Sequence, residues 1–228
     1  MSRLTTVLEH YRRLQQQVDL WFAGALQLFP EAIQCARGCS QCCRGLFDIS
    51  LLDAWVLQQG FARLPASVKQ AVLLSCRARL AELRQRWPQL RPPYFLNSLP
   101  DEGWTEMPEE DLTPCPLLSA EGLCLVYDHR PLTCRLHGLP NIDHSGEVFA
   151  DSCCSLNFPG LDPLSLEGLR GAFRRNFEQE MALLGEVTAS LLGQPLRELD
   201  TFIPLALLVD YDRLAWDEVA RSLRMAGQ

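Results

Sequence analysis

Residues 35–43 decide how the rest of this chain is interpreted, and they read Cys35-Ala36-Arg37-Gly38-Cys39-Ser40-Gln41-Cys42-Cys43. Four thiols fall within nine residues, and Gly38 lies between them, where a tight turn can direct several sulfur atoms to one centre. Thiolates are soft ligands, and four placed so close together indicate a bound metal ion or cluster. The stretch therefore predicts a metal site and leaves open what the metal does.

The ten cysteines of this 228-residue chain allow two interpretations, a disulfide framework or metal ligation. The first residues, Met-Ser-Arg-Leu-Thr-Thr, lack the continuous apolar segment of an export signal. No apolar run reaches the length of a membrane span. We therefore expect a cytoplasmic protein with no membrane partner, whose thiols stay reduced, and this favours metal ligation. The net charge of −7 argues against a nucleic-acid partner.

The first long element predicted is an amphipathic helix over residues 4–29. Its apolar residues recur at steps of three or four, and Pro30 ends it. This helix either packs on the core of its own chain or forms the seam of a homodimer. The dimer interpretation rests on Trp21 and Leu26, which widen the apolar face.

Further helices are expected along the chain, at 51–60 after a Ser50 cap, at 65–86, over about twenty residues after 165, and as shorter pieces near 186–193, 203–209 and 212–225. We therefore expect a mainly α fold in one domain, 1–228, with the cysteine motifs at 35–154 and a helical C-terminal extension at 161–228. Helices would surround an irregular cysteine-rich metal-binding centre. At most one short β-hairpin is expected, between 123–127 and 147–150.

The segment 88–116 is rich in proline and acidic residues, which exclude long regular elements. Its simpler interpretation is a solvated connector. The alternative is a lid or docking loop across the metal site, with Tyr94 and Trp104 as apolar anchors.

The second half of the motif region contributes five more cysteines, Cys115, Cys124, Cys134, Cys153 and Cys154. The first three are single residues about ten positions apart, whereas structural zinc sites usually use two paired knuckles. The spacing therefore favours a cluster or polynuclear site collected from separate loops. Cys76 lies in an apolar helical segment and is interpreted as a buried hydrophobic residue outside the site. Nine cysteines remain as metal ligands.

The adjacent pair Cys42-Cys43 is informative because neighbouring side chains in an extended chain point to opposite faces. Either the site holds more than one metal, or one of the two thiols packs without binding. Arg130 and Arg135 lie beside Cys134, and their positive charge would offset the negative charge of several thiolates. Both are therefore predicted to contact the cofactor. His129 and His137 are alternative ligands in place of a thiolate.

Together these residues form the pattern Cys35-x3-Cys39-x2-Cys42-Cys43, then Cys115, then Cys124-x2-Tyr127-x2-Arg130-Pro131-x2-Cys134-Arg135, then a cysteine at 153 or 154. In this pattern the chain resembles the zinc- or iron-chelating cysteine-cluster family of the YkgJ type. It is more distantly similar to flagellin lysine N-methylase, which carries a similar cysteine arrangement and is associated with an iron–sulfur cluster. The resemblance implies metal binding and a protein substrate or partner. No G-x-G-x-x-G follows a predicted strand, so a Rossmann-type S-adenosylmethionine site is not indicated.

The leading hypothesis is a protein whose cysteine thiolates hold an iron–sulfur cluster, most simply 4Fe-4S, that is either structural or supports redox or protein-modification chemistry. One alternative is a structural zinc module that binds a partner protein without catalysis. Another is an enzyme with one or two metal ions acting on a protein or peptide. The sequence identifies no catalytic residue.

Overall fold

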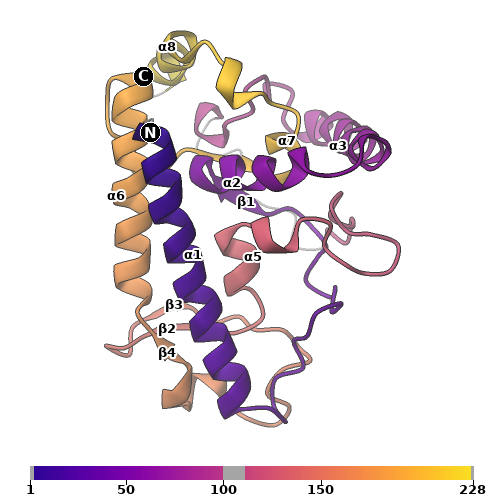
Figure 1. Cartoon of the computed structure of the whole chain (residues 1–228), viewed down its shortest axis with the longest axis vertical. Coiled ribbons are helices and arrows are strands. Elements are labelled where there is room, and N and C mark those ends of the chain that lie inside the picture. Colours follow the sequence, from indigo (N-terminus) through magenta and orange to yellow (C-terminus); the bar gives the residue numbers. More distant parts are fainter. Residues whose placement is uncertain (1–2, 100–110, 227–228) are drawn as a thin grey trace.

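The structure is a computed structural model that describes residues 3–99 and 111–226. Its helices are α1 (Arg3–Leu28), α2 (Leu51–Ala62), α3 (Ala66–Arg86), α5 (Leu132–Leu136), α6 (Phe173–Leu192), α7 (Ile203–Ala206) and α8 (Trp216–Ala226). Its strands are β1 (Asp48–Ser50), β2 (Asn141–Asp143), β3 (Val148–Ala150), β4 (Arg170–Gly171) and β5 (Asp200–Phe202). Figure 1 shows their arrangement.

The prediction of a mainly α fold around a metal-binding centre is wrong. Within the described ranges, seven helices are combined with five strands in two small sheets, which makes the fold mixed α and β. In one sheet β1 pairs antiparallel with β5. In the other, β2 pairs antiparallel with β3 and parallel with β4. Strands of two or three residues are too short to carry a recognisable alternating pattern, so of the five only β3, predicted at 147–150, is expected from the sequence.

The predicted hairpin between 123–127 and 147–150 is also wrong. Residues 148–150 pair instead with 141–143, across a turn at Gly146 in which φ is +90°. Cys124 makes an isolated antiparallel bridge with Leu118, residues 125 and 126 form a turn, and a single 3-10 turn follows at Tyr127–His129. Gly146 supplies the left-handed conformation that a tight hairpin turn requires, and this fixes the pairing nearby.

The predicted helix over 4–29 is confirmed as α1, and α6 runs antiparallel beside it (Figure 1). Trp21 of α1 meets Phe173 of α6 edge to face, with 4.8 Å between the ring centroids. Farther along, the Tyr11 hydroxyl donates to Glu180 at 2.9 Å. Trp21 is therefore used inside the chain. The homodimer through α1 stays a prediction.

Ser50 caps α2 as predicted, accepting the backbone N–H of Asp53, and α3 begins and ends close to the predicted positions. The C-terminal helix α6 begins later than expected, because residues 163–169 form two 3-10 turns first. It continues through Gly185 and ends at Gly193, where φ is +76°. A left-handed glycine is a common helix terminator.

The C-terminal segment of the chain belongs to the same core as the cysteine motifs, since it supplies β4 to one sheet and β5 to the other. Tyr94 is buried in a second apolar cluster with Trp87 and Phe202. Trp104 and the acidic residues at 101–110, on which the lid hypothesis depended, lie outside the described residues. In the part of the chain that the structure describes, no helix is long and apolar enough to cross a membrane.

Candidate metal centre

Seven of the nine predicted cysteine ligands line one cavity of about 220 Å³, namely Cys35, Cys39, Cys42, Cys43, Cys115, Cys124 and Cys134. They come from the first loop and from two neighbouring segments about 70–100 residues later, the loop 115–124 and the short helix α5. All are free thiols. The fold therefore brings together the two halves of the motif that the sequence suggested as partners.

Backbone contacts join the first and second cysteine loops directly. The N–H of Cys115 donates to the carbonyl of Cys43 at 2.9 Å. Gly38 and Gly122 face each other at the next point of approach, and a Cβ on Gly122 would lie 3.4 Å from the Gly38 carbonyl oxygen. Both glycines have positive φ, +94° and +77°. The predicted glycine turn at Gly38 thus exists, and it lets the two loops pack closely.

Burial raises the pKa of most cavity thiols. The pKa of Cys134 is raised well above its usual range by burial and then by the charge of Cys115. Burial likewise raises the pKa of Cys115 to about 11 and raises that of Cys124. Thiols with such pKa values are protonated at neutral pH, and a bound cation would convert them to thiolates. Cys115, Cys124 and Cys134 are therefore neutral donors until a cation binds.

The adjacent thiols Cys42 and Cys43 differ in their pKa. A hydrogen bond between them raises the pKa of Cys42 and lowers that of Cys43. Ionisation of Cys115, Cys134 or Cys124 would raise the pKa of Cys43, and the Cys115 N–H donates to the Cys43 carbonyl at 2.9 Å. Cys43 is therefore the thiol of the pair that is more easily ionised, and it belongs with the second loop.

Cys35 has a different environment, held by Asn157. The Asn157 amide donates to the Cys35 sulfur at 3.2 Å and to the Gly138 carbonyl at 2.6 Å, and its Oδ1 accepts the N–H of Gln34 at 2.9 Å. Asn157 is buried. Cys35 also packs with Cys153 in an apolar cluster near the end of α1, apart from the core around Cys115, Cys124 and Cys134. The predicted ligands thus fall into two environments.

The remaining cysteines lie away from the cavity wall. Cys153 and Cys154 do not line it, although the charge of Cys154 reaches Cys35. Cys76 is fully buried in α3, as expected for a small hydrophobic residue, and burial raises its pKa to about 12. Of the histidines considered, His137 lines the cavity and His129 does not.

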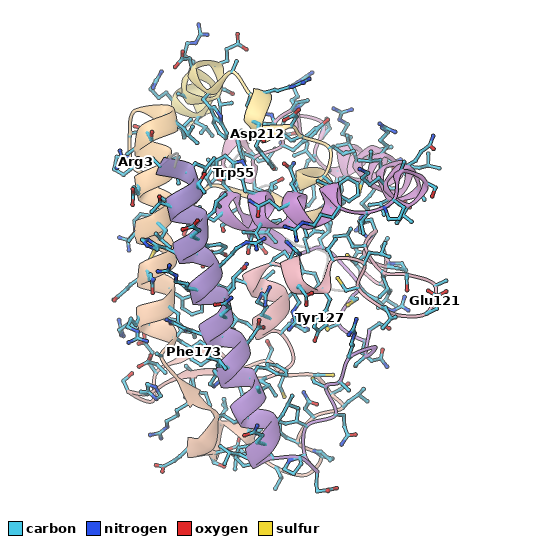
Figure 2. All side chains as sticks on the ribbon, viewed as in Figure 1. Arg3, Trp55, Glu121, Tyr127, Phe173 and Asp212 are labelled. Carbon is cyan, nitrogen blue, oxygen red and sulfur yellow. The ribbon has the colours of Figure 1, made fainter. Side chains whose placement is uncertain are left out.

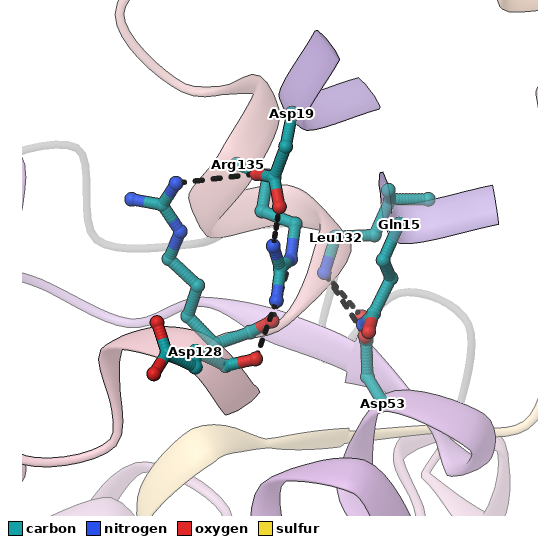
Figure 3. Close-up of polar contacts among 7 residues, drawn as sticks. Gln15, Asp19, Asp53, Asp128, Leu132 and Arg135 are labelled. Atoms are coloured by element: carbon teal, nitrogen blue, oxygen red, sulfur yellow. Dashed lines mark hydrogen bonds and ion pairs between the residues drawn. The ribbon is translucent and has the colours of Figure 1, made fainter. Parts of the chain in front are cut away.

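Arg130 and Arg135 line the cysteine cavity, but α1 holds their charges in place. Both guanidinium groups pair with Asp19, Arg130 at 3.3 Å, as Figure 3 shows. Arg135, only 5% exposed, also donates at 3.0 Å to the carbonyls of Arg130 and Asp128. The Arg130 guanidinium stacks 4.0 Å from the Tyr127 ring centroid, and its Nε is buried with no hydrogen-bond partner among the described residues. The Nε–H of Arg130 is therefore a buried hydrogen-bond donor that a group bound in the cavity could use.

A second buried contact fixes the helix that carries Cys134. Both carboxylate oxygens of Asp53 accept the N–H of Leu132, at 2.9 and 3.0 Å, and one accepts the Gln15 amide at 2.9 Å (Figure 3). Leu132 is the first residue of α5, so this carboxylate satisfies a donor that the helix cannot satisfy itself. The contact links α1, α2 and the second cysteine loop.

Sequence reasoning missed Asp19, Asp53 and Asn157. In the sequence Asp53 is an acidic residue in the first turn of α2. In the structure its carboxylate accepts the N–H of Leu132, the first residue of α5. Only Asp19 could have been noticed in the sequence, because it is an acidic residue beside the apolar face of the helix α1. Figure 2 shows Tyr127, the stacking partner of Arg130, on the side of α1 opposite α6. No pattern in the sequence pairs these residues with the cysteine loops.

In the part of the chain that the structure describes, no group of three or more His, Cys, Asp or Glu side chains is placed to hold a single metal ion. The seven thiols surround a space rather than converge on a point. Comparisons of the chain with protein-family models, with curated proteins and with solved structures found no match. The function therefore has to be inferred from the cavity and its donors.

Proposed function

We propose that this protein holds an iron–sulfur cluster, most simply 4Fe-4S, within the cysteine cavity. The observation that carries the proposal is that seven free thiols, four from 35–43 and three from 115–134, line one space of about 220 Å³. The YkgJ-type motif and its resemblance to cluster-binding proteins support the same assignment. The ten free thiols agree with a reducing compartment, so we propose the cytoplasm as its location.

A cluster suits these donors better than one zinc ion does. A structural zinc needs four ligands converging at about 2.3 Å from one point, and no such group is found among the described residues. In a cluster each thiolate binds its own iron, so the sulfur atoms stand around a larger space. The buried Arg130 Nε, without a partner, could donate to a sulfur of the bound group, and such hydrogen bonds tune a cluster.

We assign the cluster to Cys43, Cys115, Cys124 and Cys134. The last three pack against one core, and Cys43 lines the same cavity with its carbonyl bonded to the Cys115 N–H at 2.9 Å. When bound, the cluster supplies one-electron redox chemistry. The chain itself orients the thiols through α5 and the ion pairs of Asp19, and it excludes water with the apolar side chains around the cavity.

The test is iron and acid-labile sulfide analysis of protein purified without oxygen, together with its absorption spectrum. We expect a brown protein absorbing near 400 nm, with about four iron and four sulfide per chain. Cys43→Ala and Cys134→Ala should each lose the cluster, whereas Cys76→Ala, the same change outside the cavity, should retain it. A colourless protein containing only zinc would refute the proposal in favour of the structural zinc module.

A further inference from the structure

A second cavity, of about 430 Å³, lies on the other side of α5 from most of the cysteines. The β1–β5 sheet contributes one wall. Ser50 and Asp200 are directly opposite each other in that sheet, so their side chains lie on the same face. Both line the cavity, as does Asp48, two residues before Ser50. This wall therefore presents carboxylates to the cavity.

The other small sheet contributes an amide. Asn141 pairs with Ala150, and both line the cavity together with the residues two positions away, Leu139 and Ser152. The next residue, Ile142, packs in an apolar cluster with Ala25. Since neighbouring residues of a strand point to opposite faces, the Asn141 side chain faces the cavity that its partner Ala150 also lines. Asn141 is 9% exposed, and its Oδ1 is buried with no hydrogen-bond partner among the described residues. A buried acceptor left in this state is costly unless a ligand donates to it.

Carboxyl groups dominate the cavity wall, from Asp48, Asp53, Glu180, Glu198 and Asp200. Burial raises the pKa of Asp53, Glu180 and Asp200, so these three favour the protonated form until a cation binds. Glu180 accepts from Tyr11 and Ser50, and Asp53 is committed to α5. By contrast, no hydrogen bond or ion pair within residues 3–99 and 111–226 involves the Asp200 carboxylate. Burial, and then the charges of Asp48, Glu198 and Glu180, raise its pKa to about 7. A bound ammonium group would favour its ionised form.

Positive charge is scarce in the same wall. The guanidinium of Arg197, an exposed residue, lies 3.6 Å from the sulfur of Met181, and no ion pair in the described structure joins it to a carboxylate. The other side of the cavity is apolar, formed by Phe177, Met181 and Leu184 of α6 with Leu136 of α5. A ligand that fits this wall carries positive charge and a hydrocarbon portion.

We propose that this cavity binds a small organic dication, a diamine or polyamine. One ammonium group donates to the Asp200 carboxylate and the Asn141 Oδ1, the methylene chain packs on Phe177 and Met181, and a second ammonium meets Asp48 or Glu198. A metal ion does not fit the wall, since no three acidic, histidine or cysteine side chains of the described residues are placed to hold one. The volume also far exceeds what one ion needs. This site is independent of the proposed cluster.

Isothermal titration calorimetry of the full chain with putrescine and spermidine tests the proposal. Titrations at about 0.15 M salt screen the attraction of the overall negative charge. We expect saturable one-site binding, weakened at least tenfold by Asp200→Asn and by Asn141→Leu, which change opposite sheets. Circular dichroism confirms that each variant is folded. Glu178→Gln removes an equal charge from an exposed position on α6 outside the cavity and should bind as the native chain does.

Titrations with other ligands test whether the cavity requires two ammonium groups or accepts any amine. n-Butylamine, with one ammonium group, should bind at least tenfold more weakly than putrescine, and neutral butanol should not bind. Equal binding of butylamine and putrescine would overturn the assignment of a dication. Absence of saturable binding, or an equal loss in Glu178→Gln and Asp200→Asn, would overturn the site itself.

Discussion

Replacing Asp53 by alanine tests how the second cysteine loop is held. The Asp53 side chain is 2% exposed and accepts the Leu132 N–H through both oxygens and the Gln15 amide through one. The substitution leaves these two buried donors without partners. Each such loss costs about 1–3 kcal/mol, so the free energy of unfolding should fall by about 2–6 kcal/mol.

The pH dependence of that cost has a definite sign. Burial, and then the charge of Glu180, raise the pKa of Asp53 above its usual value of about 3.9. The folded state therefore keeps a proton that the unfolded chain has already released. The contribution of a group with a raised pKa is complete below about pH 4 and is lost as the pH rises through the folded pKa. The native chain therefore loses stability between pH 5 and pH 8, and Asp53→Ala does not lose this part. The difference in the free energy of unfolding between the two should be smaller at pH 8 than at pH 5.

Urea denaturation followed by circular dichroism at both pH values measures the cost. Asp212→Ala is the matched control, since Asp212 is exposed and lies far from α5, near α8 (Figure 2). Iron and sulfide content should also fall in Asp53→Ala, because α5 carries Cys134. A stability within about 0.5 kcal/mol of the native chain, the range of ordinary surface changes, would refute the role assigned to Asp53.

Three further predictions concern single positions. Gly60→Ala should lower the free energy of unfolding by about 1–3 kcal/mol, since the new Cβ would lie 2.6 Å from a carbon of His129. Gly24→Ala, with nothing within 4 Å, should raise it by up to about 1 kcal/mol. Asn157→Ala should cost about 1–3 kcal/mol in the same urea assay, and an unchanged midpoint would contradict its role. Stability should fall between about pH 4 and 7, because Asp200 keeps a proton until about pH 7 in the folded state. Asp200→Asn should flatten that slope, and equal slopes in both proteins would disprove the cause.

The long helices could be predicted because their apolar spacing repeats over many turns, and Ser50 marks the start of α2 in the sequence itself. Of the strands, only the one predicted at 147–150 is present, as β3, and the partners of the strands could not be predicted. Asp200 pairs with Ser50 across most of the chain, and no local pattern announces such a partner. A three-residue strand gains its stability from the elements around it rather than from its own residues.

For the candidate site, residue type and spacing selected the cysteines, and seven of them do line one cavity. Spacing could not show that Cys35 and Cys43 have different surroundings. The Cys35 sulfur accepts a hydrogen bond from Asn157, whereas Cys43 lies against the loop of Cys115. Nor could it reveal that Arg130 and Arg135 share Asp19 as a partner. Those distinctions depend on which helix lies beside which loop.

The pairing of β1 with β5 also sets a schedule for assembly. Ser50 leaves the ribosome 150 residues before its partner Asp200. At about 5–20 residues per second that interval lasts about 8–30 s. The loop at 35–43 is complete from the start of this wait, but the sheet next to it cannot form until the wait is over. The cavity whose wall β1 and β5 supply is therefore complete only once Asp200 has been made.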